Sequence, residues 1–116
     1  MHELSYAQQV VDAVKDELVT RKLDMKVEKV VIVAGQLNAI VPDSLTFHFD
    51  VLKSDIPQMT GAMLEIKQTP IVAECNKCHR TFEVEDMMFL CSDCDWPVSL
   101  KSGNEMWVES IILEEK

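Results

Sequence analysis

The cysteines of this chain constrain its fold more than any other feature. All four lie in two C-x-x-C pairs, Cys75 with Cys78 and Cys91 with Cys94, and twelve residues separate the pairs. This spacing lets two thiolates from one tight turn reach the same tetrahedral ion, and twelve residues suffice for two short strands and a turn that bring the pairs together. The pattern predicts a structural zinc site of the ribbon type, with these four cysteines as ligands.

Other uses of the C-x-x-C motif fit the sequence less well. His79 follows the first pair and completes a C-x-x-C-H motif of the kind that attaches haem, but haem would leave the second pair without a role. A redox pair belongs in a thioredoxin-like βαβ context, which the residues around Cys75 do not form. On the quartet alone, the alternative function is a zinc-ribbon adaptor that binds protein or nucleic acid and carries no second metal.

Length and composition favour one small folding unit with an insert. The 116 residues are 47% apolar, which allows one modest core beside a metal-held module. No segment approaches the eighteen or so uninterrupted apolar residues of a membrane span, and the first residues lack the basic and apolar regions of an export signal. We therefore expect a cytoplasmic protein with no membrane partner, in which reduced thiols bind metal instead of forming disulfides.

The charge is acidic and unevenly distributed. The net charge is −9, and residues 71–98 alone carry two basic and six acidic side chains. Nucleic-acid backbones are bound chiefly by Lys and Arg, so this module has the wrong sign and we expect no nucleic-acid partner. An acidic surface instead favours a basic protein patch or a metal cation.

Two helices are predicted outside the zinc module. Residues 4–22 place apolar side chains at steps of three and four, which is typical of an amphipathic helix. The second helix begins around Pro42, where Asp43 or its neighbours can cap free N–H groups, and it ends near Ser54. The core-facing residues expected on these helices are Leu4, Ala7, Val11, Val14, Leu18, Leu45, Phe49 and Leu52.

Three strands are predicted beside these helices, at residues 26–34, 63–68 and 105–113. The first ends in a β-branched run typical of a strand covered on both faces, and the last is too apolar to stand alone. We expect the last strand to return to the sheet of the other two. The prediction is an α+β domain, residues 1–70 plus 99–116, with an inserted zinc-ribbon domain at residues 71–98.

The amino terminus offers a second set of metal ligands. The α-amine of Met1 with the amide nitrogen and imidazole of His2 forms two fused chelate rings and leaves one position of a square plane open. Planar coordination by nitrogen and oxygen is preferred by Ni²⁺ or Cu²⁺. The alternative is that residues 1–3 only lead into the first helix, with Glu3 favourable at its positive end. The lone His48 in the second helix is expected to be a surface or core residue.

Several segments together resemble one known family. They are the Met1-His2-Glu3-Leu4-Ser5 start, the segment from Gly35 to Pro42, the two C-x-x-C pairs, and Ser102-Gly103-Asn104-Glu105 followed by Ser110-Ile111. In order and spacing they are similar to the HypA family, nickel metallochaperones of [NiFe]-hydrogenase maturation and, in some bacteria, of urease maturation. The resemblance implies two helices on a three-stranded sheet with a zinc ribbon attached.

The resemblance also implies a function that is not enzymatic. Ni(II) is the transferred cargo, held by Met1, His2 and Glu3, with Asp43 as a further ligand, and Zn(II) is structural. Some family members instead use a histidine of the zinc domain, and in this sequence only His79 could play that part, although its position does not clearly match. The implied partners are the nickel-binding GTPase of the pathway and the hydrogenase large-subunit precursor, and self-association is open.

Overall fold

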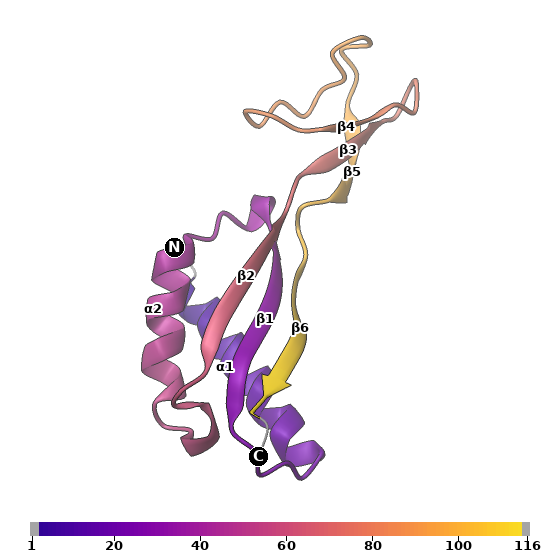
Figure 1. Ribbon diagram of the computed structural model, residues 1–116. Helices are drawn as coiled ribbons and strands as arrows, with labels where there is room; N and C mark the ends of the chain where they lie inside the picture. Colours follow the sequence, from indigo (N-terminus) through magenta and orange to yellow (C-terminus); the bar gives the residue numbers. More distant parts are fainter. Residues whose placement is uncertain (1–2, 115–116) are drawn as a thin grey trace. The chain divides into compact units, whose positions relative to one another are not determined.

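The computed structural model describes residues 3–114, so the predicted nickel ligands Met1 and His2 lie outside the described residues. No helix in this described range is long and apolar enough to cross a membrane. In chain order the elements are α1 (Glu3–Thr20), β1 (Val27–Gly35), η1 (Gln36–Asn38), α2 (Pro42–Lys53), η2 (Pro57–Met59), β2 (Met63–Thr69), β3 (Val72–Cys75), β4 (Thr81–Glu83), β5 (Val98–Ser102) and β6 (Met106–Leu113) (Figure 1).

The chain divides into two compact units. The first, here called the helical unit, contains residues up to 33, residues 40–67 and residues from 107 onward. The second, the ribbon unit, contains residues 34–39 and 68–106. The predicted assignment of residues 71–98 to a zinc domain and of the remainder to a nickel domain stays a prediction.

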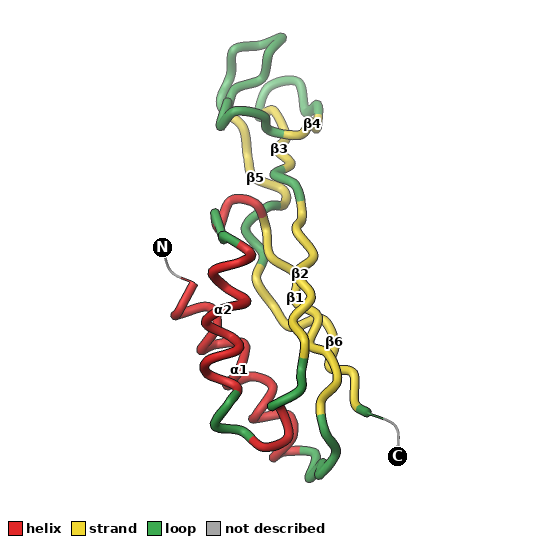
Figure 2. Tube along the Cα trace, turned by 60° about the vertical axis from the view of Figure 1, so that its left-hand side comes forward, coloured by secondary structure: helices red, strands yellow, loops and turns green. Residues whose placement is uncertain are grey.

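Two helices cover one face of a three-stranded sheet in the helical unit. The strand order is β2-β1-β6, and both helices lie on the same side of the sheet (Figure 2). This confirms the predicted α+β class and the return of the last strand to the sheet. The second half of β1, from Val30 to Gly35, is buried at every position, as its β-branched run predicted.

The buried stripe of α1 differs from the prediction at its first position. Ala7, Val11, Val14 and Leu18 are buried as expected, whereas the side chain of Leu4 is 55% exposed. The buried stripe continues toward the amino terminus to Glu3, four residues before Ala7. Because each residue of an α-helix is rotated by about 100° from the one before it, Leu4 points away from the core. The prediction of Leu4 as a core residue was therefore wrong.

The end of α1 is a Schellman turn formed without glycine. Lys22 has a φ of 54°, and its N–H donates to the Val19 carbonyl at 3.2 Å, while the Leu23 N–H donates to the Leu18 carbonyl at 2.9 Å. These are the two hydrogen bonds that satisfy the last carbonyls of a helix in this motif. The turn stops the helix at Thr20, two residues before the predicted end.

Helix α2 begins and ends where the sequence predicts. Leu45 and Phe49 are fully buried, and Pro42 occupies the first turn, where a missing N–H costs no hydrogen bond. The N-cap residue of the helix is Val41, and no side-chain hydrogen bond caps the helix there. The expected capping by the side chain of Asp43 or its neighbours is therefore not found at the N-cap position.

The ribbon unit has its own sheet, with strand order β4-β3-β5 and antiparallel pairing throughout. In the central strand β3, Ala73 lies opposite Phe82 of β4 and Leu100 of β5. Strand β4 lies between the two cysteine pairs, where the twelve intervening residues allow a short strand. The strands β3 and β5, which are four and five residues long, were not predicted.

Residues 34–39, which include the last two residues of β1, belong to the ribbon unit. Leu37 packs against the small core of Ile71, Ala73 and Val84, and its N–H donates to the Gly103 carbonyl at 2.7 Å. The Gly35 N–H and the Asn38 amide both donate to the Glu105 carbonyl, each at 2.7 Å. This turn therefore extends the hydrophobic core of the ribbon with residues from outside the cysteine segment.

Candidate metal centre

The first cysteine pair forms a tight turn at the end of β3. The Cys75 N–H donates to the Arg80 carbonyl at 2.9 Å, and the His79 N–H donates to the Cys75 carbonyl at 3.0 Å. The backbone N–H groups of Lys77 and Cys78 both point at the Cys75 sulfur, at 3.4 Å. Two amide donors on one sulfur favour its thiolate form, which is the form that binds metals.

The second cysteine pair repeats the hydrogen bonds of the first. The Cys91 N–H donates to the Trp96 carbonyl at 3.1 Å, and the Asp95 N–H donates to the Cys91 carbonyl at 2.7 Å. The residue after each pair takes a left-handed conformation, with φ of 62° at His79 and 51° at Asp95. The two turns are therefore local copies of one backbone conformation, as the equal C-x-x-C spacing implies.

The structure brings all four cysteines together. Their sulfur atoms lie within 4.8 Å of one another, with Cys75 and Cys91 buried and the other two more accessible, and the Cys78 and Cys91 sulfurs are 3.8 Å apart. A tetrahedral zinc ion with Zn–S bonds of about 2.3 Å requires sulfurs about 3.8 Å apart. Among residues 3–114, this quartet is the one group of three or more metal-ligating side chains close enough to share an ion. The donor set thus fits a four-thiolate zinc site.

The electrostatics of the quartet favour a divalent cation. The pKa of Cys75 is lowered, chiefly because the Cys78 N–H donates to its sulfur. The pKa of Cys94 is raised, chiefly by its hydrogen bond with Cys78 and next by burial. One thiolate thus forms readily, whereas a fourth negative charge so close to the others is unfavourable. A bound Zn²⁺ would supply the positive charge that allows all four to ionise.

The amino-terminal end of α1 is tied to the start of α2 through Glu3. The Glu3 side chain is buried, and its carboxylate accepts the Val41 N–H at 3.2 Å. The pKa of Glu3 is lowered to about 2, and among the described residues the Val41 N–H contributes to this shift by donating to the carboxylate. Asp43 follows two residues after Val41 and is exposed. The structure therefore brings Glu3 to the loop that leads to Asp43, a contact that sequence reasoning missed.

The two described histidines lie in different surroundings. His79 is exposed in the first cysteine turn, with its Nδ1 3.9 Å from a carboxylate oxygen of Glu74. His48 lies in α2, where its ring plane makes an angle of 75° with that of Phe47 and the ring centres are 5.4 Å apart. Neither joins a metal-ligating group among residues 3–114. The prediction that His48 is a surface or core residue is consistent with this placement.

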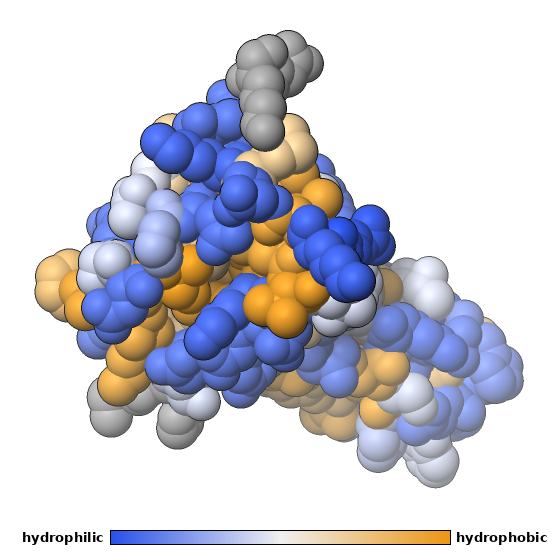
Figure 3. All heavy atoms as spheres, turned by 90° about the horizontal axis from the view of Figure 1, so that it is seen from below, coloured by the Kyte–Doolittle hydropathy of each residue, from blue (hydrophilic) through white to orange (hydrophobic). Residues whose placement is uncertain are grey.

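A hollow of about 430 Å³ in the helical unit offers no comparable chemistry. It lies beside the end of α1, and its lining includes Leu18, Val19, Lys22, Asp55 and Ile56. Figure 3 views the molecule from below, where hydrophobic side chains reach the surface between hydrophilic ones. The lining contains neither cysteine nor histidine, so the cysteine quartet remains the metal site that the described residues support.

Comparisons with known proteins agree with this architecture. Hydrogenase maturation factor HypA of Desulfatibacillum aliphaticivorans is 38% identical over 112 residues, covering 96% of this chain and 85% of that protein. The HypA of Desulfosudis oleivorans is 36% identical over 116 residues, covering 99% of this chain and all of that protein. The solution structure of the Ni metallochaperone HypA from Helicobacter pylori matches this fold with a TM-score of 0.70 at 22% identity, and each chain is fully covered.

A sequence model of a whole protein family also matches this chain. The sequence model of the family described as "Hydrogenase/urease nickel incorporation, metallochaperone, hypA" matches residues 1–113. The matched range includes both the amino-terminal segment and the four cysteines. The chain therefore belongs to the HypA family of hydrogenase and urease nickel incorporation metallochaperones.

Proposed function

We propose that this protein binds Ni(II) at its amino terminus and delivers it during [NiFe]-hydrogenase maturation, with urease as a second recipient. Met1, His2 and Glu3 hold the nickel, and Asp43 supplies a further ligand. Zn(II) is held by Cys75, Cys78, Cys91 and Cys94 and serves the fold. The observation that carries this proposal is the family match over residues 1–113, which includes the Met-His-Glu start.

The contact between Glu3 and Val41 supports the inclusion of Asp43. It holds the residue after His2 against the loop that leads into α2, and Asp43 is an exposed carboxylate at the start of that helix. Ni²⁺ accepts planar nitrogen and oxygen ligands, so a carboxylate is a suitable fourth donor beside the amine, amide and imidazole nitrogens. Because the amide and imidazole must lose protons to bind, nickel affinity is expected to fall as the pH is lowered.

The proposed delivery requires protein partners in the cytoplasm. These are the nickel-binding GTPase of the maturation pathway, which takes up the metal, and the hydrogenase large-subunit precursor, which receives it. Exchange of elements between two copies of the chain provides a route to self-association.

Nickel titration of the untagged protein tests the site. The wild-type chain is expected to bind one Ni²⁺, and His2→Ala is expected to abolish this binding while the zinc content stays unchanged. The matched control is His48→Ala, which removes an imidazole from α2 and should leave nickel binding intact. Unchanged nickel stoichiometry in His2→Ala would refute the amino-terminal site.

Two further variants test the amine of Met1 and the carboxylate of Asp43 as nickel ligands. Residues added before Met1 remove the free amine and should abolish binding as completely as His2→Ala. Asp43→Asn should weaken nickel binding and leave the unfolding free energy unchanged, because its side chain is exposed. Full nickel affinity in Asp43→Asn would remove this residue from the site and leave the other three in place.

A further inference from the structure

The cysteine segment of the ribbon unit exposes several large apolar side chains. Met87 and Met88 are 60% and 62% exposed, and Leu90 and Trp96 are also exposed. Leu90 pairs with Pro97 in an isolated β-bridge, and the Cys91 N–H donates to the Trp96 carbonyl at 3.1 Å, so the backbone at Leu90 lies beside the backbone at Trp96 and Pro97. We call Met87, Met88, Leu90 and Trp96 the ribbon-tip surface.

The turn that presents the methionines is strained. The Met88 N–H donates to the Glu85 carbonyl at 3.0 Å, and the two central residues, Asp86 and Met87, have φ angles of 51° and 59°. Positive φ at both central positions defines a type I′ turn, in which glycine is preferred at the position of Met87. Because the Met87 side chain is mostly exposed, burial within the fold does not offset this strain. Strain of this kind is a sign of a functional segment.

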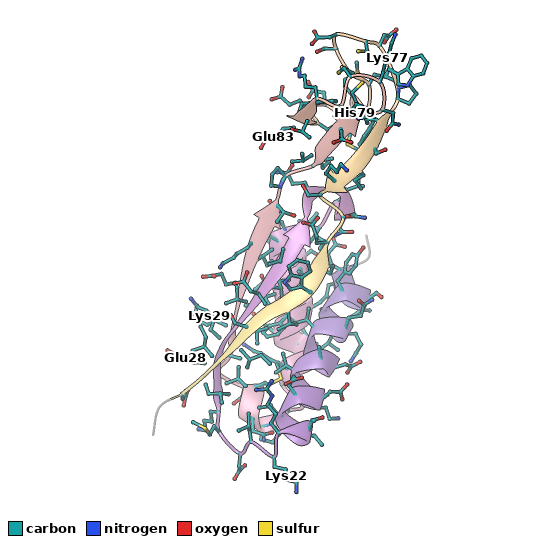
Figure 4. The ribbon with its side chains drawn as sticks, turned by 90° about the vertical axis from the view of Figure 1, so that its right-hand side faces the viewer. Lys22, Glu28, Lys29, Lys77, His79 and Glu83 are labelled. Atoms are coloured by element: carbon teal, nitrogen blue, oxygen red, sulfur yellow. The ribbon has the colours of Figure 1, made fainter. Side chains whose placement is uncertain are left out.

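The charged groups around this surface leave it acidic. The Lys77 ammonium lies 5.3 Å from the centre of the Trp96 ring, and the Arg80 guanidinium is paired with Asp93 at 2.6 Å. Figure 4 shows Lys77 and His79 in the loops of this unit and Glu83 on β4. Lys77 and Arg80 are the only Lys and Arg residues of the segment 71–98. Four of its carboxylates have no ion-pair partner among residues 3–114: Glu83, Glu85, Asp86 and Asp95.

We propose that the ribbon-tip surface binds a protein segment that has an apolar face flanked by Lys and Arg. The methionines are flexible and polarisable and adapt to apolar side chains of a partner, and the tryptophan is a typical anchor of interfaces. The surrounding carboxylates attract basic residues and repel nucleic acids and anionic membranes. This surface is independent of the proposed nickel site, so either proposal can fail while the other stands.

A designed peptide pair tests the chemistry. The probe is an eighteen-residue peptide with leucines at helical spacing and lysines elsewhere, and its control carries glutamate in place of lysine. With zinc-loaded, nickel-free, full-length protein, the lysine peptide is expected to shift the amide resonances of residues 85–97, and more weakly as salt is added. Equal binding of the glutamate peptide, or shifts confined to other residues, would overturn the proposal.

Paired variants then test the surface itself. Met87→Gly with Met88→Ser removes both methionine side chains, and glycine at position 87 adopts the positive φ without strain. The double variant should therefore be at least as stable as the wild type, while it binds the lysine peptide about tenfold more weakly. The matched control is Val51→Ser, which removes a similarly exposed apolar side chain from α2 and should leave binding unchanged. The proposal is wrong if the double variant binds as tightly as the wild type, or if Val51→Ser weakens binding equally.

Discussion

Two glycines determine how the turn at residues 34–39 joins the ribbon unit. A Cβ atom on Gly35 would lie 2.0 Å from the Gly103 carbonyl oxygen, and one on Gly103 would lie 2.7 Å from the Ile71 Cα. Gly103 also has a φ of 111°, which side-chain-bearing residues rarely adopt. The close backbone contact that places Leu37 in the ribbon core therefore depends on the absence of side chains at both positions.

Gly35→Ala is expected to destabilise the protein by about 3 kcal/mol or more, because the three nearest obstructing atoms, two of Gly103 and one of Asn104, belong to the backbone and cannot move aside as a side chain would. Urea unfolding followed by circular dichroism measures this. Gly61→Ala is the matched control, since its Cβ meets nothing within 4 Å, and its effect should stay within about 0.5 kcal/mol. Equal effects of the two substitutions would contradict the steric argument.

Glu105 contributes stability that depends on its charge. The pKa of its carboxyl is lowered from 4.5, chiefly by its own backbone N–H and next by the Gly103 N–H. A lowered folded-state pKa means that this stabilisation is complete above pH 4.5 and is lost as the pH falls below that value. Glu105→Gln should therefore be less stable than the wild type at pH 7, and the difference should shrink on acidification.

Thermal unfolding of both proteins from pH 7 to pH 3 measures the Glu105 effect. Acid also releases metal from thiolates, so the informative quantity is the difference in stability between the two proteins at each pH. A difference that stays constant over this range would show that the carboxylate charge has no part in holding the Gly103 turn.

At the scale of elements, the end of α1 shows how a helix terminates without glycine. The left-handed conformation of Lys22 allows the Leu23 N–H to reach the Leu18 carbonyl, and the polar Lys22 side chain stays exposed. The sequence pattern predicted a longer helix because Arg21 and Lys22 are compatible with a polar helix face. Hydrogen bonding at the terminus, which depends on backbone conformation, determined the actual end.

Lys22→Gly is expected to stabilise the protein by about 1 kcal/mol, because glycine adopts positive φ without the clash of a Cβ atom. Lys15→Gly provides the control within the same helix. It should destabilise by about 1 kcal/mol, because glycine in a helix interior costs backbone entropy. Chemical denaturation compares both variants, and the same sign for the two changes would contradict the assignment of the Schellman turn.

The molecule as a whole combines two units with different sources of stability. The helical unit buries a continuous apolar core between its helices and sheet, including Val14, Ile32, Leu45 and Phe49. The ribbon unit has a core of only Ile71, Ala73 and Val84 with a few half-buried neighbours. So small a core stabilises a fold weakly, and a bound metal contributes folding free energy directly. The ribbon unit should thus depend on its metal and the helical unit should not.

Metal removal by a chelator under reducing conditions tests this division. Amide resonances of residues 68–106 should lose their dispersion, and those of Leu37 and Asn38 should change with them, because this turn packs against the ribbon core. Resonances of residues 42–53 in α2 should persist. Cys78→Ser should reproduce the result. A uniform loss of signals throughout the chain would show that the two units unfold together.

Much of this architecture follows from local patterns in the sequence. The spacing within each C-x-x-C pair dictates a local turn, and the apolar periodicity of α1 and α2 dictates which helix faces are buried. The apolar character of residues 105–113 required a sheet partner, and β6 finds one. The positions of the zinc and nickel ligands stay predictions, although the structure does bring the four cysteine sulfurs together.

The remaining features depend on contacts between residues far apart in the chain. Leu4 is exposed because Glu3 occupies the buried position and accepts the Val41 N–H, 38 residues away. The turn at residues 34–39 joins the ribbon unit because Gly35 and Gly103 allow two backbones to touch. The sequence by itself therefore determined both helices, the strands β1, β2 and β6 and the cysteine turns, since short-range periodicity and spacing control them. Only the tertiary structure decided which segments pack together, because that depends on close approach of distant residues.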